Sequence, residues 1–410
     1  MPGSLTCDAD ADAAFALIER ALTLDPACAP AWAARGNLLL RRGKIDDARA
    51  AYERAAQLDA DDASARYALA ELAYLERDEA TAQRWFDAAF ARARLFSPPA
   101  PHAGARHALV LGLAGPWPRN MPLDFVVDDR RWTLHRWFLP DAQAATRPLP
   151  PVELIVNACG ESVAARAAIA DAQRIIARLG MPAINDPQRL RGLARDRFAA
   201  TAAGVTGVRV PVARRLSARA LAGAGAGGAY PLLVRPVDAH GGQGLERLDD
   251  PAQLAAYLER ANAAEYDCTP YVEYRSADGW YRKYRIMFVA GVPYPYHLAL
   301  DRDWMIHYYR TGTAATPWMR AEETAFLTAP ERVLAGWRAV LPALGAALGL
   351  DYVGIDCAQL PDGTLLAFEA DSAMLVHAFD ASEDGRFKRA AVDRIRAALA
   401  ALFDRRAGGA

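Results

Sequence analysis

A 34-residue periodicity in the first hundred residues limits what this chain can fold into. Ala48, Tyr52 and Ala55 form a small–large–small apolar pattern that recurs 34 positions earlier and 34 positions later. The matching positions are Ala14, Ile18 and Ala21 upstream and Ala82, Phe86 and Ala89 downstream. A fixed period of this length is typical of stacked helix pairs, in which small residues lie where helices cross closely. We therefore predict about five helices between residues 10 and 96.

The central unit of this pattern adds Trp32, Gly36 and Leu39 on its first helix and Gly43 at the following turn. With these residues it resembles the tetratricopeptide repeat, which implies an all-α repeat domain at residues 1–97. Stacked repeats form concave surfaces, so the resemblance implies a bound peptide or protein, or packing against the rest of the chain. A generic alanine-rich bundle is the alternative, and the fixed period disfavours it.

Composition excludes several classes of function. The formal net charge is −1 with both signs interspersed, which gives no basic patch for a nucleic acid. The five cysteines include no C-x-x-C pair, so neither a zinc site nor a disulfide framework is indicated. No apolar run approaches the roughly 20 residues of a membrane helix, and the polar N-terminus lacks a signal-peptide pattern. We expect a cytoplasmic protein that binds neither membrane nor nucleic acid.

The pattern of apolar residues changes after the proline-rich stretch at residues 98–104, which we interpret as a linker. Short apolar runs such as HALVLGL and ELIVN then alternate with helical segments. Strand-then-helix alternation of this kind predicts an α/β layer structure, which we assign to residues 105–205.

Three carboxylates near the C-terminus form the strongest chemical signal. Glu369 and Asp371 are two apart on a predicted strand and so leave the same face. The turn at residues 361–363 folds this strand back on its neighbour, which brings Asp356 to that face. Three converging carboxylates repel one another unless a cation neutralises them, and Mg²⁺ prefers such hard oxygen ligands. Solvated strand-end carboxylates are the alternative, but their apolar neighbours disfavour unpaired charge.

The hairpin GIDCAQLPDGTLLAFEAD resembles the end of an ATP-grasp domain. That family places an Asp thirteen residues before a Glu and an Asn two residues later, and the spacing here is the same, with Asp371 in place of the Asn. The resemblance implies an α+β ATP-grasp fold: the α/β domain described above, then one lobe at residues 206–275 and a second at 276–405. It also implies a metal site made of Asp356, Glu369 and Asp371.

Two further segments resemble the parts of this family that hold the nucleotide phosphates. In LARDRFAATAAGVTGVRVP, Arg197 stands where the family has a first lysine, and in YPLLVRPVDAHGGQG, Arg235 stands for the second. Arginine and lysine both bind phosphate but with different geometry. His240 and the glycines after it are nucleotide-binding candidates, and these glycines allow backbone amides to approach phosphate oxygens. These glycines are Gly241, Gly242 and Gly244.

Two more segments follow in the family's order. TPYVEY resembles the hinge that holds adenine, which implies backbone contacts from Tyr271 and Val272 and a ribose contact from Glu273. RKYRIMFV resembles the strand with a cation beside the transferred phosphate, for which we prefer Arg285. Lys283 shares the face of Arg285 and is one of only three lysines, so we add it to the catalytic candidates; a solvated strand lysine is the alternative.

Candidate substrate residues lie in two further segments. VNACGES occupies the place where relatives contact the carboxylate substrate, which implies Asn157 and Glu161 as substrate-binding residues. A strand-to-helix turn with a helix-capping residue is the alternative explanation of this segment. The segment PYHLALDRDWMIHYYRTG contributes His297, His307 and Arg310 as acceptor-site candidates. A core-facing strand with packed aromatic residues is the alternative explanation there.

Taken with these residues, the resemblance implies an ATP-dependent carboxylate–amine ligase that works through an acyl phosphate. Its cofactors would be ATP and Mg²⁺, with Mn²⁺ as an alternative, and its acceptor a peptide or another amino compound. A homodimer is also expected from the resemblance. Two other functions stay open: a small-molecule kinase on the same fold, and an adaptor that senses nucleotide and binds a protein through its repeats.

Overall fold

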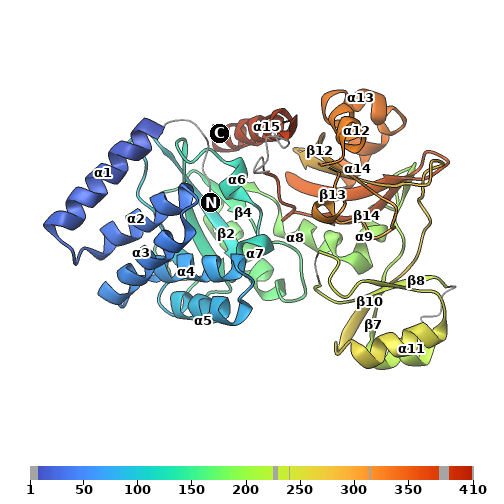
Figure 1. The fold of residues 1–410 in the computed structure, drawn as a ribbon, viewed down its shortest axis with the longest axis horizontal. Helices are drawn as coiled ribbons and strands as arrows, with labels where there is room; N and C mark the ends of the chain where they lie inside the picture. Colours follow the sequence, from blue (N-terminus) through green and yellow to red (C-terminus); the bar gives the residue numbers. More distant parts are fainter. Residues whose placement is uncertain (1–7, 225–229, 240, 314, 378–386, 409–410) are drawn as a thin grey trace.

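The structure is a computed structural model that describes residues 8–224, 230–239, 241–313, 315–377 and 387–408. A helical array comes first in the chain and is blue in Figure 1. Three β-sheets follow it. The predicted order of an all-α repeat domain followed by α+β structure is confirmed. Within the described part of the chain, the helices are all too short or too polar to cross a membrane.

The helical array consists of five helices in the described N-terminal region, as the periodicity predicts. They are α1 (Asp8–Leu24), α2 (Ala29–Arg41), α3 (Ile45–Leu58), α4 (Ala63–Leu75) and α5 (Glu79–Phe90). A Cβ atom on Gly36 would lie 2.5 Å from the ring of Tyr52, so the glycine allows α2 and α3 to cross closely. Asp62 and Asp78 accept hydrogen bonds from the first turns of α4 and α5, which fixes where these helices begin.

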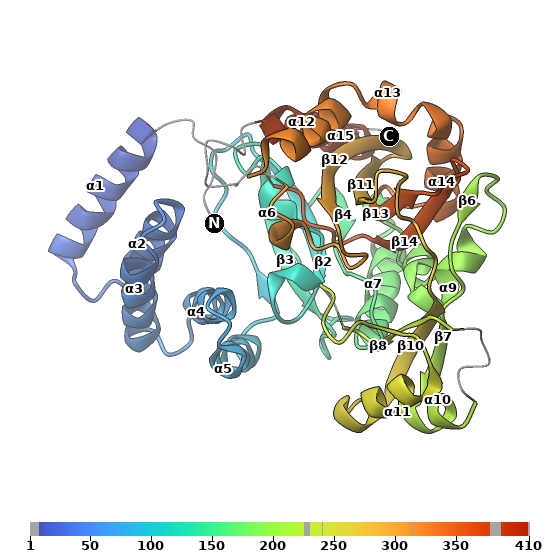
Figure 2. The same cartoon turned by 45° about the vertical axis from the view of Figure 1, so that its right-hand side comes forward.

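The first sheet lies next to the array and is mostly parallel. Its strand order is β1 (Leu95–Phe96), β3 (Trp132–Leu139), β2 (Arg106–Leu113), β4 (Leu154–Asn157) and β5 (Ala183–Ile184). Helices η1 (Trp117–Arg119), α6 (Leu123–Val126) and α7 (Arg166–Leu179) belong to the same part of the chain. Figure 2 shows α4 and α5 beside this sheet, and an aromatic cluster joins them to it. Its rings are those of Tyr67, Phe86, Phe90, Phe96 and Phe138.

The second sheet, here called the roof sheet, is small and antiparallel. Its order is β7 (Arg214–Ser217), β10 (Glu265–Pro270), β8 (Leu232–Pro236) and β9 (Glu246–Leu248). Helices α10 (Ala218–Ala224) and α11 (Pro251–Arg260) contribute to a separate apolar core with it, which contains Leu221, Val234 and Tyr257. Asp250 caps α11 and Pro251 occupies its first turn.

The third sheet, here called the floor sheet, has the order β12 (Val292–Asp301), β11 (Tyr281–Val289), β13 (Tyr352–Gln359), β14 (Leu365–Asp371) and β6 (Val208–Arg209). The predicted hairpin is confirmed as β13 and β14, which are antiparallel. Asp362 accepts a hydrogen bond from the Thr364 amide in the turn, and Gly363 has φ +87° there. Only glycine adopts such a backbone conformation readily.

The remaining helices are associated with the floor sheet. They are α8 (Pro187–Leu190), η2 (Arg191–Leu193), α9 (Arg195–Thr201), η4 (Tyr308–Arg310), α12 (Pro317–Thr328), α13 (Pro330–Val333), η5 (Ala335–Trp337), α14 (Val340–Leu348) and α15 (Arg389–Gly408). Apolar residues of these helices bury both sides of the sheet: Phe326 and Leu344 belong to one core, Ile395 and Phe403 to another. The floor sheet is therefore a rigid base, whereas the roof sheet has only its own small core.

Candidate active site

A cavity of about 850 Å³ lies among the floor sheet, the roof sheet, the turn after β4 and helix α5. Both sheets contribute charged side chains to it, together with the aromatic residues that follow β10 and β12. A volume of this size lies within the range of about 300–1,000 Å³ usual for ligand sites.

Cross-strand pairing places four cavity-lining residues in one row on the floor sheet. Arg285 on β11 is paired with His297 on β12 and with Asp356 on β13. Asp356 is in turn paired with Glu369 on β14. Directly paired residues share a face of a sheet, so this row presents a histidine, a cation and two carboxylates to the same cavity.

Asp356 holds two cations in place. Its Oδ1 accepts a 2.6 Å bond from Arg285 Nε, and its Oδ2 lies 2.9 Å from Arg285 Nη2 and 3.1 Å from Lys283 Nζ. The carboxylate is only 2 % exposed. Burial alone would raise the pKa of Asp356, but the two neighbouring cations hold that pKa well below its usual range. The group is therefore a permanent anion that fixes Arg285 and Lys283.

Glu369 connects the floor to the roof through Arg195 on α9. Arg195 Nη2 lies 3.3 Å from Glu369 Oε2, and its Nη1 lies 3.9 Å from Asp267 Oδ2 on β10. Asp267 is also bonded at 3.2 Å by Arg215 of β7. Burial would raise the pKa of Glu369, but the charge of Arg195 lowers it. This arginine thus spans the two sheets that face the cavity.

Arg195, and not the predicted Arg197, reaches the cavity. Arg197 is exposed and lies outside the cavity lining, whereas Arg195 and the buried Phe198 both line it. Residues three apart share a face of a helix, so the pairing of Arg195 with Phe198 is the signal that identifies the inward arginine. The predicted position is therefore two residues too far along the chain.

The predicted phosphate loop also lines the cavity. Gly241 and Gly242 contribute to its wall and have φ values of +58° and +78°. Gly244 has a different role: a Cβ there would lie 2.8 Å from the ring of Pro236. Arg235 lines the cavity and donates to the carbonyl of Ala239. Burial, with a further contribution from the charge of Arg195, lowers the pKa of Arg235 to about 10. His240 lies outside the described residues.

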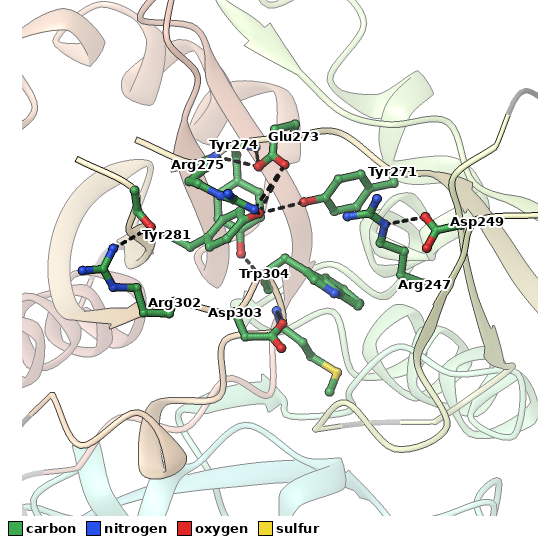
Figure 3. Close-up of polar contacts among 12 residues, drawn as sticks. Arg247, Asp249, Tyr271, Glu273, Tyr274, Arg275, Tyr281, Arg302, Asp303 and Trp304 are labelled. Atoms are coloured by element: carbon green, nitrogen blue, oxygen red, sulfur yellow. Dashed lines mark hydrogen bonds and ion pairs between the residues drawn. The ribbon is translucent and has the colours of Figure 1, made fainter. Parts of the chain in front are cut away.

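The predicted adenine hinge forms an aromatic corner of the cavity. Arg247 lies 4.4 Å from the ring centroid of Tyr271, and the indole of Trp304 meets that ring edge-on at 5.8 Å (Figure 3). Tyr271 and Val272 both line the cavity. The amide of Tyr271 donates to the carbonyl of Pro231 at 2.9 Å, so this amide is already bonded within the protein.

Glu273 does not line the cavity, which corrects its predicted ribose contact. Figure 3 shows its carboxylate turned toward its own loop. Oε1 accepts bonds from the amides of Tyr274 and Arg275 at 3.0 and 2.9 Å, and Oε2 accepts one from the Tyr281 hydroxyl at 3.2 Å. Glu273 therefore stabilises the turn that follows the hinge.

The five substrate candidates separate into two groups. Glu161, His297, His307 and Arg310 line the cavity. Asn157 does not: it is fully buried and donates to the carbonyl of Asn185 at 3.0 Å, so it joins strands in the core. Burial, with Asp238 close by, raises the pKa of Glu161 to about 7. Burial and the charge of Arg285 lower the pKa of His297, which makes its imidazole neutral.

Sequence reasoning missed Lys388 as a site residue. It is 4 % exposed, lines the cavity, and its Nζ lies 3.6 Å above the ring of Tyr308 and 3.8 Å from Glu323 Oε1. The available signal was the scarcity of lysine, since only three occur in the chain. Two of them, Lys283 and Lys388, line this cavity.

The predicted convergence of three carboxylates on a metal is wrong. Within the described ranges, no group of three or more His, Cys, Asp or Glu side chains is arranged to hold a metal ion. Asp356 is unsuited because both its oxygens are bonded to cations. Glu369 and Asp371, however, are two apart on β14 and both line the cavity. This edge fits Mg²⁺, which commonly binds one or two carboxylates together with substrate phosphates and water.

Comparison with known proteins supports the assignment of the N-terminal helices. Residues 36–75 match the family model of the TPR repeat. This segment is a TPR repeat. It contains the end of α2, all of α3 and all of α4. A search of curated protein sequences finds no matching relative.

Among solved structures, the chain is similar to D-alanine–D-alanine ligase from Bacillus anthracis complexed with ATP. The identity is 14 %, over 72 % of this chain and 98 % of the other, with a TM-score of 0.42. It is also similar to the VanG D-Ala:D-Ser ligase of Enterococcus faecalis, with 12 % identity over 73 % and 99 % of the chains and a TM-score of 0.46. A RimK domain ATP-grasp protein from Sphaerobacter thermophilus shares 14 % identity over 71 % and 99 %, with a TM-score of 0.40.

Proposed function

We propose that this protein is an ATP-dependent ligase of the ATP-grasp type, which joins a carboxylate to an amine through an acyl phosphate. The observation that carries the proposal is the charged row on the floor sheet. Arg285, Asp356 and Glu369 share one cavity with the glycine loop and with Arg235 of the roof sheet. Fixed cations and carboxylates in one cavity suit phosphoryl transfer, in which catalysis is mostly positioning and charge stabilisation.

The lining supports one orientation of ATP. The adenine fits the aromatic corner beside Tyr271, where the Tyr271 carbonyl can accept from its amino group. The phosphates then lie beneath Gly241 and Gly242, close to Arg235 and Arg195. Glycines with positive φ allow backbone amides to approach phosphate oxygens without steric conflict. Mg²⁺ or Mn²⁺ held by Glu369 and Asp371 would supply charge neutralisation between these carboxylates and the phosphates.

The chemistry then has two steps. An oxygen of the donor carboxylate attacks the terminal phosphorus of ATP, the bond to the bridging oxygen breaks, and ADP leaves. The acceptor nitrogen next attacks the acyl carbon, phosphate leaves, and the nitrogen loses a proton. Arg285 and Lys283 stabilise the negative charge on the transferred group, because Asp356 holds both cations at fixed positions. Closure of the two sheets over the bound substrates would limit hydrolysis of the acyl phosphate.

Incubation with ATP, Mg²⁺ and a cell metabolite extract tests the proposal. We expect ADP release and a new product whose mass equals a carboxylic acid plus an amine minus water. Arg285→Ala should reduce the rate about 10²–10³-fold, the effect typical of removing one stabilising group. Arg302→Ala is the matched control, because Arg302 is exposed and outside the cavity lining. A product that gains only a phosphate would instead indicate a kinase, and ATP binding without turnover would indicate a nucleotide-sensing adaptor.

A further inference from the structure

The cavity does not end at the catalytic row but continues to the repeat domain. Tyr74 at the end of α4 and four residues of α5 line the same cavity as Arg285 and Glu369. The four residues of α5 are Glu79, Ala82, Gln83 and Phe86. Nothing in the chemistry proposed above requires a helix of the repeat domain, so this wall needs a separate explanation.

A chain of direct contacts connects η1 to the end of the catalytic strand β14. The amide of Gly160 donates to the carbonyl of Arg119 in η1 at 2.9 Å. A Cβ on Gly160 would lie 2.7 Å from that carbonyl oxygen and 3.2 Å from Ala373 Cβ. Ser372 Oγ donates to the carbonyl of Cys159 at 3.2 Å. The turn that carries Glu161 is thus wedged between η1 and the end of β14, directly after Asp371.

This junction is rich in carboxylates. Asp238 of the roof accepts bonds from the amides of Val163 and Ala164 at 3.0 and 3.2 Å, which holds it beside the turn. Glu161, Asp238 and Asp371 all line the cavity there. The raised pKa of Glu161 has the same origin, since burial and the charge of Asp238 are its main causes. An ammonium or amine group would relieve this excess of negative charge.

Beyond this junction the cavity is lined by α5, which presents both exposed polar and buried apolar residues. On α5, Glu79 and Gln83 are exposed, whereas Ala82 and Phe86 are buried beneath them. The aromatic cluster around Phe86 and Phe90 holds the helix firmly against the first sheet. From Glu79 to Phe86 the helix advances by about 10 Å at 1.5 Å per residue. About three residues of extended peptide cover that length at 3.3 Å each.

We propose that α5 is one wall of the acceptor site and that the acceptor is a peptide of three or more residues. Its N-terminal amine points to Glu161 and Asp238, and its chain lies along Glu79, Gln83 and Phe86. This inference rests on the proposed ligase function and names its acceptor class. The helical array therefore contributes to substrate binding through its last helix, α5, which follows the TPR repeat, while the same helix anchors the array to the sheet.

The test is peptide binding by the full-length protein with ATP and Mg²⁺ present. The probes are a random hexapeptide library with free N-termini and the same library N-acetylated, with retained peptides identified by mass spectrometry after ultrafiltration. We expect retention of free-amine peptides and at least tenfold less retention of acetylated ones. Gln83→Trp places a bulky side chain in the part of the cavity beside α5 and should lower peptide retention at least tenfold. Arg84→Trp, on the same helix but outside the cavity lining, should leave retention unchanged.

A second measurement separates this inference from the proposed function. ADP release is compared with the hexapeptide library and with a mixture of the twenty free amino acids as acceptors, in metabolite extract. Greater release with peptides, reduced by Gln83→Trp, supports the inference. Equal release with both acceptors and no effect of Gln83→Trp would overturn it while leaving the ligase intact. Specific peptide retention without any ADP release would uphold the peptide site and contradict the ligase.

Discussion

The floor and roof sheets enclose the same cavity but hold their charges in different ways. The floor sheet is buried on both sides, and each member of its Arg285–Asp356–Lys283 group is bonded to an opposite charge. The roof sheet has a small core of its own and one ion pair, Arg215 with Asp267, but its Arg235 is bonded to a backbone carbonyl. The paired charges of the floor therefore contribute to its stability. In the roof, by contrast, burial disfavours the charged form of Arg235. Such a cation is ready for an anionic ligand.

Removing Asp356 should have the largest effect. Asp356→Ala leaves the partly buried Arg285 and Lys283 without their shared counter-charge, and breaking a buried ion pair in this way costs about 3–5 kcal/mol. We expect a loss of that size in the free energy of unfolding, measured by urea denaturation, together with loss of ADP release. Asp249→Ala on the exposed roof surface is the control and should change stability by less than about 0.5 kcal/mol. Near-native stability of Asp356→Ala would contradict a floor stabilised by charge.

Removing Arg235 from the roof should give the opposite pattern. Arg235→Met keeps the volume of the stem and removes a charge that burial already disfavours, since the pKa of Arg235 is lowered to about 10. We expect unfolding within about 1 kcal/mol of the native protein but a fall of roughly 10²–10³-fold in ADP release. Urea denaturation and a coupled ADP assay measure the two quantities. A loss of stability as large as that of Asp356→Ala would show that the two sheets do not differ in the way described.

The sequence predicted best those features that are local in the chain. The 34-residue period identifies the repeats, and the turn at residues 361–363 with alternation on both sides identifies β13 and β14. The residues of the floor row follow from strand register, and all of them were candidates. The errors concern which way a side chain points: Arg197 was chosen for Arg195, and Asn157 and Glu273 proved to stabilise turns and strand connections.

The repeat wall of the cavity was not predictable in the same way. Nothing in the local pattern of α5 distinguishes Gln83 from any other exposed residue of an amphipathic helix. Its position in the cavity depends on the docking of α4 and α5 through Tyr67, Phe90 and Phe138, which are far apart in sequence. The bonding of Asp356 to two cations likewise depends on the pairing of β11 with β13, 71 residues later. Contacts between residues far apart in the sequence therefore determine both the position of Gln83 and the bonding of Asp356.

A smaller effect is expected at the junction between floor and first sheet. Gly160→Ala introduces a Cβ 2.7 Å from the carbonyl oxygen of Arg119, a backbone atom that cannot move independently. Overpacking of this kind typically costs about 1–3 kcal/mol, and we expect a loss in that range by urea denaturation. Gly204→Ala is the matched control, because a Cβ there has no atom within 4 Å among the described residues. Equal stability of the two variants would show that the wedge between η1 and β14 is loose.

The smallest expected effect is the pH dependence contributed by Glu161, where the roof loop meets this junction. Its pKa is raised from 4.5 to about 7 by burial, by Asp238, and further by Asp196 and Asp371, while Arg215 opposes the shift. The folded state therefore holds a proton on Glu161 that the unfolded chain releases, and stability from this group is full below pH 4.5 and lost as pH rises through 7. Glu161→Gln has no proton to lose. We expect the two proteins to have similar free energies of unfolding at pH 5. At pH 8 we expect Glu161→Gln to be more stable than the native protein by roughly 1 kcal/mol, after allowance for partial solvent exposure.

The control is Glu259→Gln, on the exposed surface of α11, which should show no such pH-dependent difference in stability. If the Glu161→Gln advantage were the same at both pH values, the carboxylates at the junction would not be coupled, and the attraction of an amine to this point of the cavity would lose its electrostatic basis.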